Sequence, residues 1–254
     1  MRVSYLPVRG TLRELYQQPR DMRRFRNYLA CLTGGTDDIV LPIGVANPMA
    51  KEHALRKLDE LAALGAETIG AQAAEDAAHR LAPVPGEVEI KAALVLVDDV
   101  GGGWTNRYTT EASVRFPGRG ALKRPFATGL VWTSESPAAE EVRQELLAAI
   151  YRVAYQQRRG LPATLEVMLD QEGLAGLFAG ARPSLTDAAL RQARTIVHAH
   201  VAKATYPTAF ACLYGDEAAT QLGYQPLGLP ARAGFAVAMA DALEHQRDPL
   251  AALL

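Results

Sequence analysis

The clearest hydrophobic pattern in the chain is a two-residue alternation in its middle third. Residues 87–98 place five aliphatic side chains on one face of a strand, and the opposite face becomes apolar toward the end of the segment. Residues 105–116 alternate along their whole length. Because a glycine-rich loop joins the two segments, we expect them to pair as an antiparallel hairpin. A third strand is expected from Phe126 to Trp132.

Periods of three to four residues predict helices on either side of these strands. The strongest pattern opens at Ser136-Pro137, recurs as far as Val153 and ends at Gly160. Shorter apolar segments favour strands at 165–169 and 209–214, and residues 39–43 suit an edge strand because Pro42 lacks the N–H that pairing requires. The other expected helices cover residues 11–18, 22–32, 47–64, 66–81, 174–179, 184–204, 216–222 and 231–247.

These elements predict one α+β domain, residues 1–254, in which amphipathic helices cover a mainly antiparallel sheet. The hairpin at about 87–116 forms the centre of that sheet, and further strands extend it. The sequence shows no internal repeat, low-complexity tract or linker rich in Pro and Ser. A division near residue 160 is the alternative organisation.

Composition identifies the broad class of protein but does not identify its function. The chain has 254 residues, 49% of them hydrophobic and 22% charged, and its formal net charge is −1. That balance gives no global attraction to nucleic acid, and no apolar run approaches a membrane span, so we expect neither partner. Cys31 and Cys212 show no metal-binding or redox spacing. With no leader segment visible, we expect a cytoplasmic protein, either a monomer or a homo-oligomer.

The densest set of polar groups follows the first predicted strand. Asp98 and Asp99 end that strand and are candidate catalytic residues, because neighbouring carboxylates can act in acid–base chemistry or hold a cation. The loop after them offers unhindered backbone amides, a stacking surface, a side-chain amide and a guanidinium fork. The predicted ligand-binding residues are Gly101, Gly102, Gly103, Trp104, Asn106, Arg107 and Tyr108.

This loop is the basis of the first functional hypothesis, which is binding of a small polar or anionic molecule and catalysis on it. The loop has neither the Walker spacing nor the dinucleotide fingerprint, so no cofactor is identified. The alternative interpretation is a plain hairpin turn, in which Trp104 shields the end of the sheet.

The amino-terminal segment is rich in arginine. Its first 26 residues carry seven Arg against Glu14 and Asp21, a local balance of +5. The pattern fits either a docking face for an anionic partner or an ordinary solvated helix face. The docking interpretation gives the second functional hypothesis, a non-catalytic interaction protein.

The histidines predict no metal site by themselves. His198 and His200 lie two positions apart on a predicted helix, where such side chains diverge by about 200°, so we expect His200 to face inward and His198 outward. His53 lies near the start of another helix. A site that joins His53, His200 and the carboxylate of Asp98 or Asp99 requires the fold to assemble it.

Two short runs near the carboxyl end carry a family resemblance. They are Leu213-Tyr214-Gly215-Asp216 and Leu222-Gly223-Tyr224-Gln225-Pro226-Leu227-Gly228. Together they resemble the tail of GNAT acetyltransferases, in which a strand, a short helix and such a turn follow a long helix. The resemblance implies an acyltransferase, which is the third functional hypothesis. The family's loop for the acetyl-CoA pyrophosphate has no counterpart here, since Gly180-Ala181-Arg182-Pro183-Ser184 stands in its place.

Overall fold

The computed structural model describes residues 1–100, 106–202 and 204–254. The chain is mostly helical, with 58% helix and 8% strand. It divides into two compact units, residues 1–154 and 155–254, and each is described by itself.

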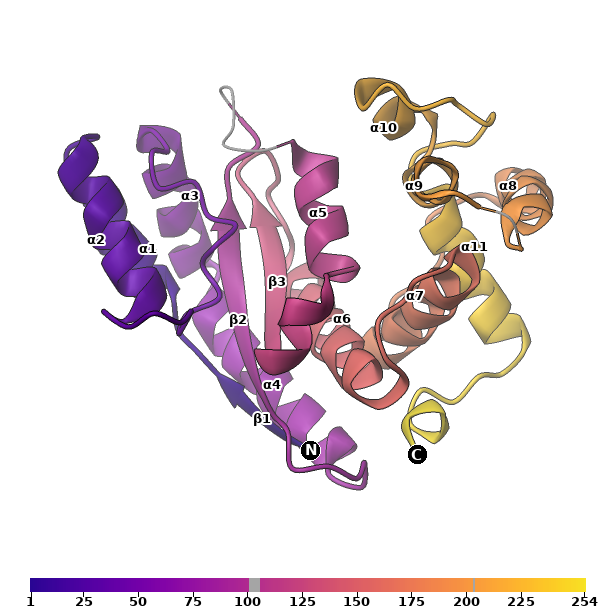
Figure 1. The fold of residues 1–254 in the computed structure, drawn as a ribbon, viewed down its shortest axis with the longest axis horizontal. Helices are drawn as coiled ribbons and strands as arrows, with labels where there is room; N and C mark the ends of the chain where they lie inside the picture. Colours follow the sequence, from indigo (N-terminus) through magenta and orange to yellow (C-terminus); the bar gives the residue numbers. More distant parts are fainter. Residues whose placement is uncertain (101–105, 203) are drawn as a thin grey trace. The chain divides into compact units, whose positions relative to one another are not determined.

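Unit 1 is built on a three-stranded parallel sheet (Figure 1). The central strand, β2, is buried along nearly its whole length, which explains the apolar run on both of its faces. The first strand has only four residues, too few for an alternation to show in the sequence. In the spatial order β1-β2-β3, the strands are β1 (Arg2–Tyr5), β2 (Glu89–Val97) and β3 (Phe126–Trp132).

The predicted antiparallel sheet is therefore wrong. The chain leaves β2 and reaches β3 through helix α5 (Arg107–Arg115), so the two strands run in the same direction. Nine residues are too few for the helical and strand periods to be told apart. Two local interactions favour the helix: the Asn106 side chain caps its first turn, and buried Glu111 and Arg115 form an ion pair of 2.7 Å one turn apart.

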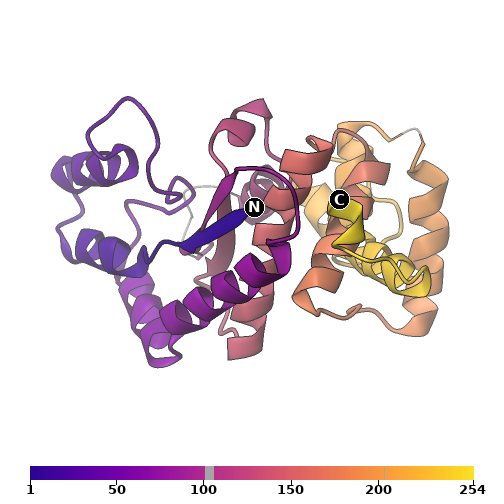
Figure 2. The ribbon, with the colours of Figure 1, turned by 90° about the horizontal axis from the view of Figure 1, so that it is seen from below.

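Helices cover both faces of this sheet. Helix α4 runs along β1 (Figure 2), and α6 packs on the same face, where a Cβ on Gly129 of β3 would lie 3.2 Å from Leu146. On the opposite face, Val114 of α5 packs against Val97 and Trp132. The helices of unit 1 are α1 (Arg9–Gln17), α2 (Met22–Thr33), α3 (Glu52–Ala63), α4 (Ala66–Leu81), α5, the 3-10 turn η1 (Arg119–Lys123) and α6 (Ala139–Arg159), which continues past residue 154.

Several boundaries test the pattern analysis directly. Helices α4 and α6 confirm the segments predicted for them, and β2 and β3 confirm two of the predicted strands. Residues 39–43 form turns and bends instead of an edge strand. The helix predicted to open at Asn47 begins at Glu52, because the Asn47 side chain is engaged elsewhere in the fold. The first helix begins at Arg9, two residues before its predicted start at residue 11.

Unit 2 is entirely helical within its described residues. The strands predicted at 165–169 and 209–214 are wrong, since both segments lie in buried helices that are apolar on nearly all sides. Thr164 caps the first of these helices, and Pro207 lies in the first turn of the second. The helices are α7 (Leu165–Ala179), α8 (Asp187–His200), α9 (Tyr206–Tyr214), α10 (Asp216–Gln221), α11 (Ala233–Glu244) and the 3-10 turn η2 (Ala251–Leu253).

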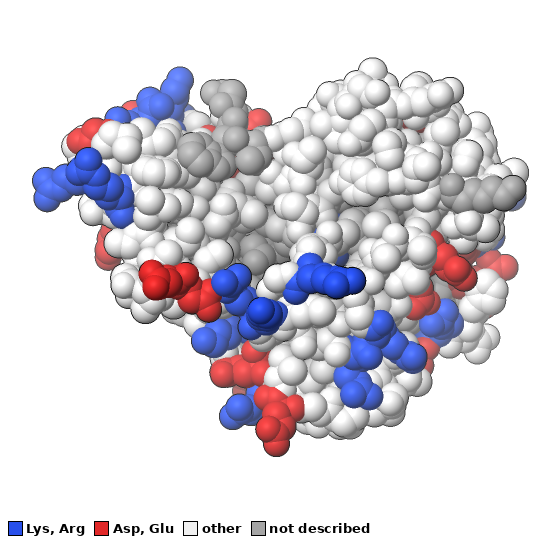
Figure 3. All heavy atoms as spheres, viewed as in Figure 1, with Lys and Arg blue, Asp and Glu red and all other residues white. Residues whose placement is uncertain are grey.

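The surface agrees with the nearly balanced composition. Positive and negative side chains are interspersed on the face shown in Figure 3. Among the described residues, no helix combines the length and the apolar character that crossing a membrane requires.

Candidate functional site

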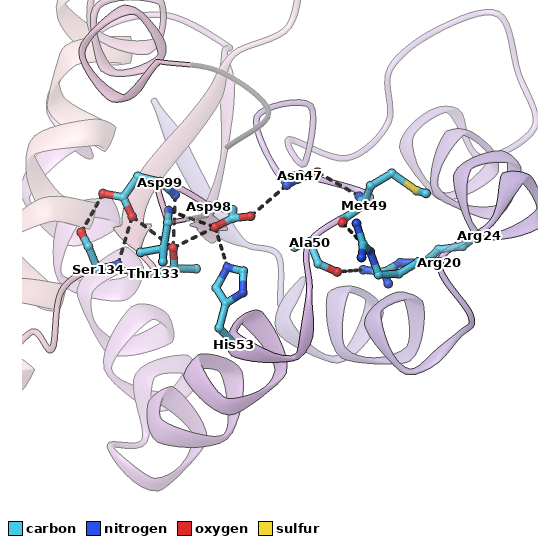
Figure 4. A network of polar contacts seen from close by, with 11 residues as sticks. Arg20, Arg24, Asn47, Met49, Ala50, His53, Asp98, Asp99, Thr133 and Ser134 are labelled. Carbon is cyan, nitrogen blue, oxygen red and sulfur yellow. Dashed lines mark hydrogen bonds and ion pairs between the residues drawn. The ribbon is translucent and has the colours of Figure 1, made fainter. Parts of the chain in front are cut away.

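The candidate site lies where β2 and β3 end. Their carboxyl ends meet at one edge of the parallel sheet, and this edge is where open α/β sheets commonly bind ligands. Asp98 and Asp99 follow β2, while Thr133 and Ser134 follow β3. Figure 4 shows these four side chains in one hydrogen-bonded network with His53, which comes from the first turn of α3.

Asp98 is the buried centre of the network, with 5% of its surface exposed. Its Oδ1 accepts from His53 Nε2 at 2.7 Å, and its Oδ2 accepts from Asn47 Nδ2 at 2.9 Å. Thr133 Oγ1 at 3.1 Å and the Val100 amide at 3.2 Å also contact Oδ1. Burial alone would raise the pKa of Asp98, but the hydrogen bonds from His53 and Asn47 outweigh it and hold the pKa below its usual value. Asp98 is therefore an ionised acceptor.

His53 has its ring orientation fixed by this carboxylate. Because an ionised carboxylate only accepts, Nε2 of His53 carries the hydrogen, and a neutral ring keeps its lone pair on Nδ1. About a fifth of the His53 side chain, 21%, remains exposed. The arrangement is that of a histidine base held and oriented by a buried aspartate.

Asp99 joins the loop after β3 to the start of α5. Its Oδ1 accepts from the Ser134 amide at 3.0 Å and contacts Thr133 Oγ1 at 3.1 Å. Its Oδ2 accepts from Ser134 Oγ at 2.7 Å and from Arg107 at 2.9 Å. Both of its oxygens accept hydrogen bonds from these segments, so Asp99 holds them together.

Arg107 is also fully engaged. It pairs with Asp99 and with Glu135, donates to Ser134 Oγ at 3.2 Å, and lies over the Trp132 ring, 4.7 Å from its centroid. Burial would lower its pKa, but the bonds to Glu135 and the nearby carboxylates outweigh it and raise the pKa of Arg107. This guanidinium is already neutralised and is not an open clamp for an anion.

Two arginines of the amino-terminal segment hold the loop that precedes α3. Arg24 is buried and donates to the Ala50 carbonyl at 2.9 Å, while Arg20 donates to the Met49 carbonyl at 3.0 Å. Both hold the loop that carries Asn47 to Asp98 (Figure 4). Part of the arginine excess predicted for a docking face therefore lies inside the unit.

The other predicted site residues lie at α5, in unit 2 or outside the described part of the chain. Asn106 caps α5, and Tyr108 is half-buried within that helix. His200 belongs to unit 2, so the suggested site with His53 receives no support. Gly101, Gly102, Gly103 and Trp104 lie outside the described residues.

Sequence analysis missed Asn47, Thr133 and Ser134. Thr133 and Ser134 directly follow a predicted strand, and the rule that parallel strands gather ligands at their carboxyl ends would have selected them had the strands been read as parallel. The local sequence predicts a helix start at Asn47, whereas the bond from its side chain to Asp98 spans 51 positions in sequence. No local pattern contains that contact.

The described residues give no support to metal or thiol chemistry. No group of three or more potential metal ligands occurs within residues 1–100, 106–202 and 204–254. Cys31 and Cys212 are free thiols. Burial and then the nearby Glu14 carboxylate raise the pKa of Cys31, which opposes the thiolate, and burial raises the pKa of Cys212 to about 11.

Comparison with known proteins adds no assignment. No family model, curated protein or solved structure matches the chain.

Proposed function

We propose that unit 1 binds a small polar molecule at the carboxyl edge of β2 and β3, and that His53 accepts a proton from it. The observation that carries this proposal is the 2.7 Å contact between His53 Nε2 and Asp98 Oδ1, with Asp98 buried and ionised. Such a pair orients the imidazole and stabilises the cation that forms when Nδ1 takes a proton.

The two aspartates take supporting roles in this scheme. Both oxygens of Asp98 and both oxygens of Asp99 accept hydrogen bonds within the network, so we assign the two aspartates supporting roles and proton acceptance to His53. Asp98 positions His53 and compensates its positive charge. Asp99 fixes Arg107 and the loop after β3 around the same edge.

Charge selects the class of ligand. The network contains three carboxylates, Asp98, Asp99 and Glu135, and one guanidinium, Arg107, which sum to −2 while His53 is neutral. This local field disfavours an anion and favours a neutral or cationic molecule. A hydroxyl or amine group on that molecule would provide the proton that His53 accepts.

The test is a thermal-shift screen of the full chain against sugars, polyols, nucleosides, amines and amino acids, repeated with His53→Gln and with His79→Gln. His79 is an exposed residue of α4 and provides a matched substitution away from the network. We expect ligands that raise the melting temperature of the wild type and of His79→Gln but not of His53→Gln. The proposal would be refuted if every stabilising ligand stabilised all three proteins equally, or if no ligand raised the melting temperature of the wild type.

A second candidate is the interaction protein, and the outer face of α2 favours it. Met22 is 60% exposed and Leu29 is 41% exposed, with exposed Arg23 and Arg26 beside them on the same helix. An acidic, apolar partner would fit this face. Reversal of both arginines to Glu should abolish capture of such a partner, and retained capture would eliminate this candidate.

The acyltransferase hypothesis gains nothing from the fold. The strand that the resemblance implies before Gly215 is helix α9, and the sheet of unit 1 is parallel.

A further inference from the structure

Unit 2 contains a cavity of about 450 Å³ that the site in unit 1 does not involve. This volume is within the range of small-molecule sites, about 300–1,000 Å³. Its walls come from the first half of α7, the carboxyl-terminal end of α8, and the second half of α11 with the residues after it.

Small residues let α7 and α11 pack closely together at the cavity wall. A Cβ on Gly173 of α7 would lie 2.4 Å from the Ala238 carbonyl oxygen of α11 and 3.1 Å from the Ala242 side chain. Leu169 and Val201 complete an apolar floor. Such a floor suits the hydrocarbon part of a ligand.

The polar wall is acidic. It carries Glu166, Asp170 and Asp241 against Arg247, a sum of −2 with the imidazoles neutral. Asp170 pairs with Arg247 at 2.9 Å. Asp170 also accepts from Tyr155 at 2.8 Å, and burial, followed by this bond, raises the pKa of Tyr155 and keeps its hydroxyl protonated.

Asp241 organises the part of this wall that α11 contributes. His198 Nε2 lies 2.8 Å from Asp241 Oδ2, and the His245 Nδ1–H donates to the Asp241 carbonyl at 2.7 Å. Arg194 Nε lies 2.7 Å from Asp241 Oδ1, in an ion pair whose N–H is not aligned for a hydrogen bond. Arg194 also pairs with Glu244, so these two outer charges cancel and the sum of −2 stands.

The helix ends add to this field. Helices α8 and α11 both present their carboxyl-terminal turns, where the backbone dipoles carry partial negative charge, while α7 presents its amino-terminal half with Glu166 and Asp170. Glu166 is exposed and makes no ion pair within the residues that the structure describes. We propose that this cavity binds a small organic ammonium ion, with its apolar body on the floor and its charged nitrogen at the Glu166–Asp241 wall.

The test uses three probes of similar size and different charge: phenethylamine, phenethyl alcohol and hydrocinnamate. Each is titrated into the full chain by calorimetry near neutral pH and low ionic strength. We expect phenethylamine to bind several-fold tighter than the alcohol, and hydrocinnamate to bind weakest. Added salt should reduce the difference, because the selection is electrostatic.

A matched pair of variants locates the effect. Glu166→Gln should weaken phenethylamine about two- to fivefold, the range of a partly exposed ion pair. Glu217→Gln, the same change on the exposed face of α10, should leave its affinity unchanged. Equal affinity for the amine and the alcohol, tightest binding of hydrocinnamate, no binding of any probe, or equal weakening by both variants would overturn the proposal. Far-UV circular dichroism confirms that both variants are folded.

Discussion

Replacement of Asp98 by Asn tests whether the buried network of unit 1 depends on a charge. The substitution keeps the volume but converts one acceptor oxygen into a donor. Three donors face Oδ1 and one, from Asn47, faces Oδ2. The new amide nitrogen must therefore confront a donor whichever way it is placed. Asn47 has little freedom to adapt, because its own Oδ1 accepts from the Met49 amide at 2.9 Å.

The expected cost follows from these contacts. In the variant, the new amide nitrogen and the donor that it faces are both left without an acceptor, at a residue with only 5% of its surface exposed. The hydrogen bonds from His53 and Asn47 also no longer go to a charged acceptor. Unsatisfied buried donors and charge-assisted bonds each contribute about 1–3 kcal/mol, so we expect Asp98→Asn to lower the free energy of unfolding by about 2–4 kcal/mol. The exposed Asp59→Asn is the control and should change it by no more than about 0.5 kcal/mol.

The pH dependence gives an independent signature. The pKa of Asp98 is depressed in the folded protein, so its contribution is present above the unfolded-state pKa, about 3.9, and is lost as pH falls through the folded value. The difference between wild type and Asp98→Asn should therefore shrink as the pH falls below about 4.

Urea unfolding followed by tryptophan fluorescence measures this difference within unit 1. A Trp104→Phe background leaves Trp132, at the end of β3, as the single reporter, which avoids averaging over two units that need not unfold together. A double-mutant cycle with His53→Gln should give a coupling of about 1–2 kcal/mol. A loss under about 1 kcal/mol, or a coupling near zero, would show that the carboxylate is not paired as described.

Two further predictions address packing and thiol chemistry. In thermal unfolding, Gly173→Ala should destabilise unit 2 by about 2–4 kcal/mol, because the added Cβ would overlap the Ala238 carbonyl. Gly10→Ala, which has open space around the added Cβ, should stabilise α1 by up to about 1 kcal/mol. Cys31 should react with a thiol reagent at mildly alkaline pH while Cys212 reacts only after urea is added, because Cys212 is fully buried and its pKa is raised to about 11; equal rates would contradict this.

The long elements of unit 1 could be predicted because their patterns are long. The β2 segment carries an apolar run, and α6 spans 21 residues with acidic residues at its start and basic residues at its end. The direction of strand pairing could not be predicted, because it depends on a nine-residue segment that fits both periods. A cap at Asn106 and the buried pair of Glu111 and Arg115 decide it, and the burial of that pair is a tertiary fact.

The candidate site shows the same division between local and long-range information. Asp98, Asp99 and Arg107 lie close in sequence, so a local pattern could select them. Their roles depend on distant partners: Asp98 contacts His53 across 45 positions and Asn47 across 51. Because those contacts engage both oxygens of Asp98, the proposed function assigns proton transfer to His53 and not to the aspartates that the sequence favours.

Two His–Asp side-chain pairs occur in the part of the chain that the structure describes, and they differ in burial. His53 and Asp98 have 21% and 4% of their side chains exposed, whereas His198 and Asp241 have 51% and 24%. In the more buried pair, His53 and Asp98, the charge interaction is strong, so the aspartate fixes one ring orientation and stabilises a cation on the ring. In the more exposed pair, His198 and Asp241, water screens the contact, so a ligand can replace one partner of the pair at small cost. This difference in burial supports the proton-accepting role proposed for His53 and the ligand-binding role proposed for the wall that carries Asp241.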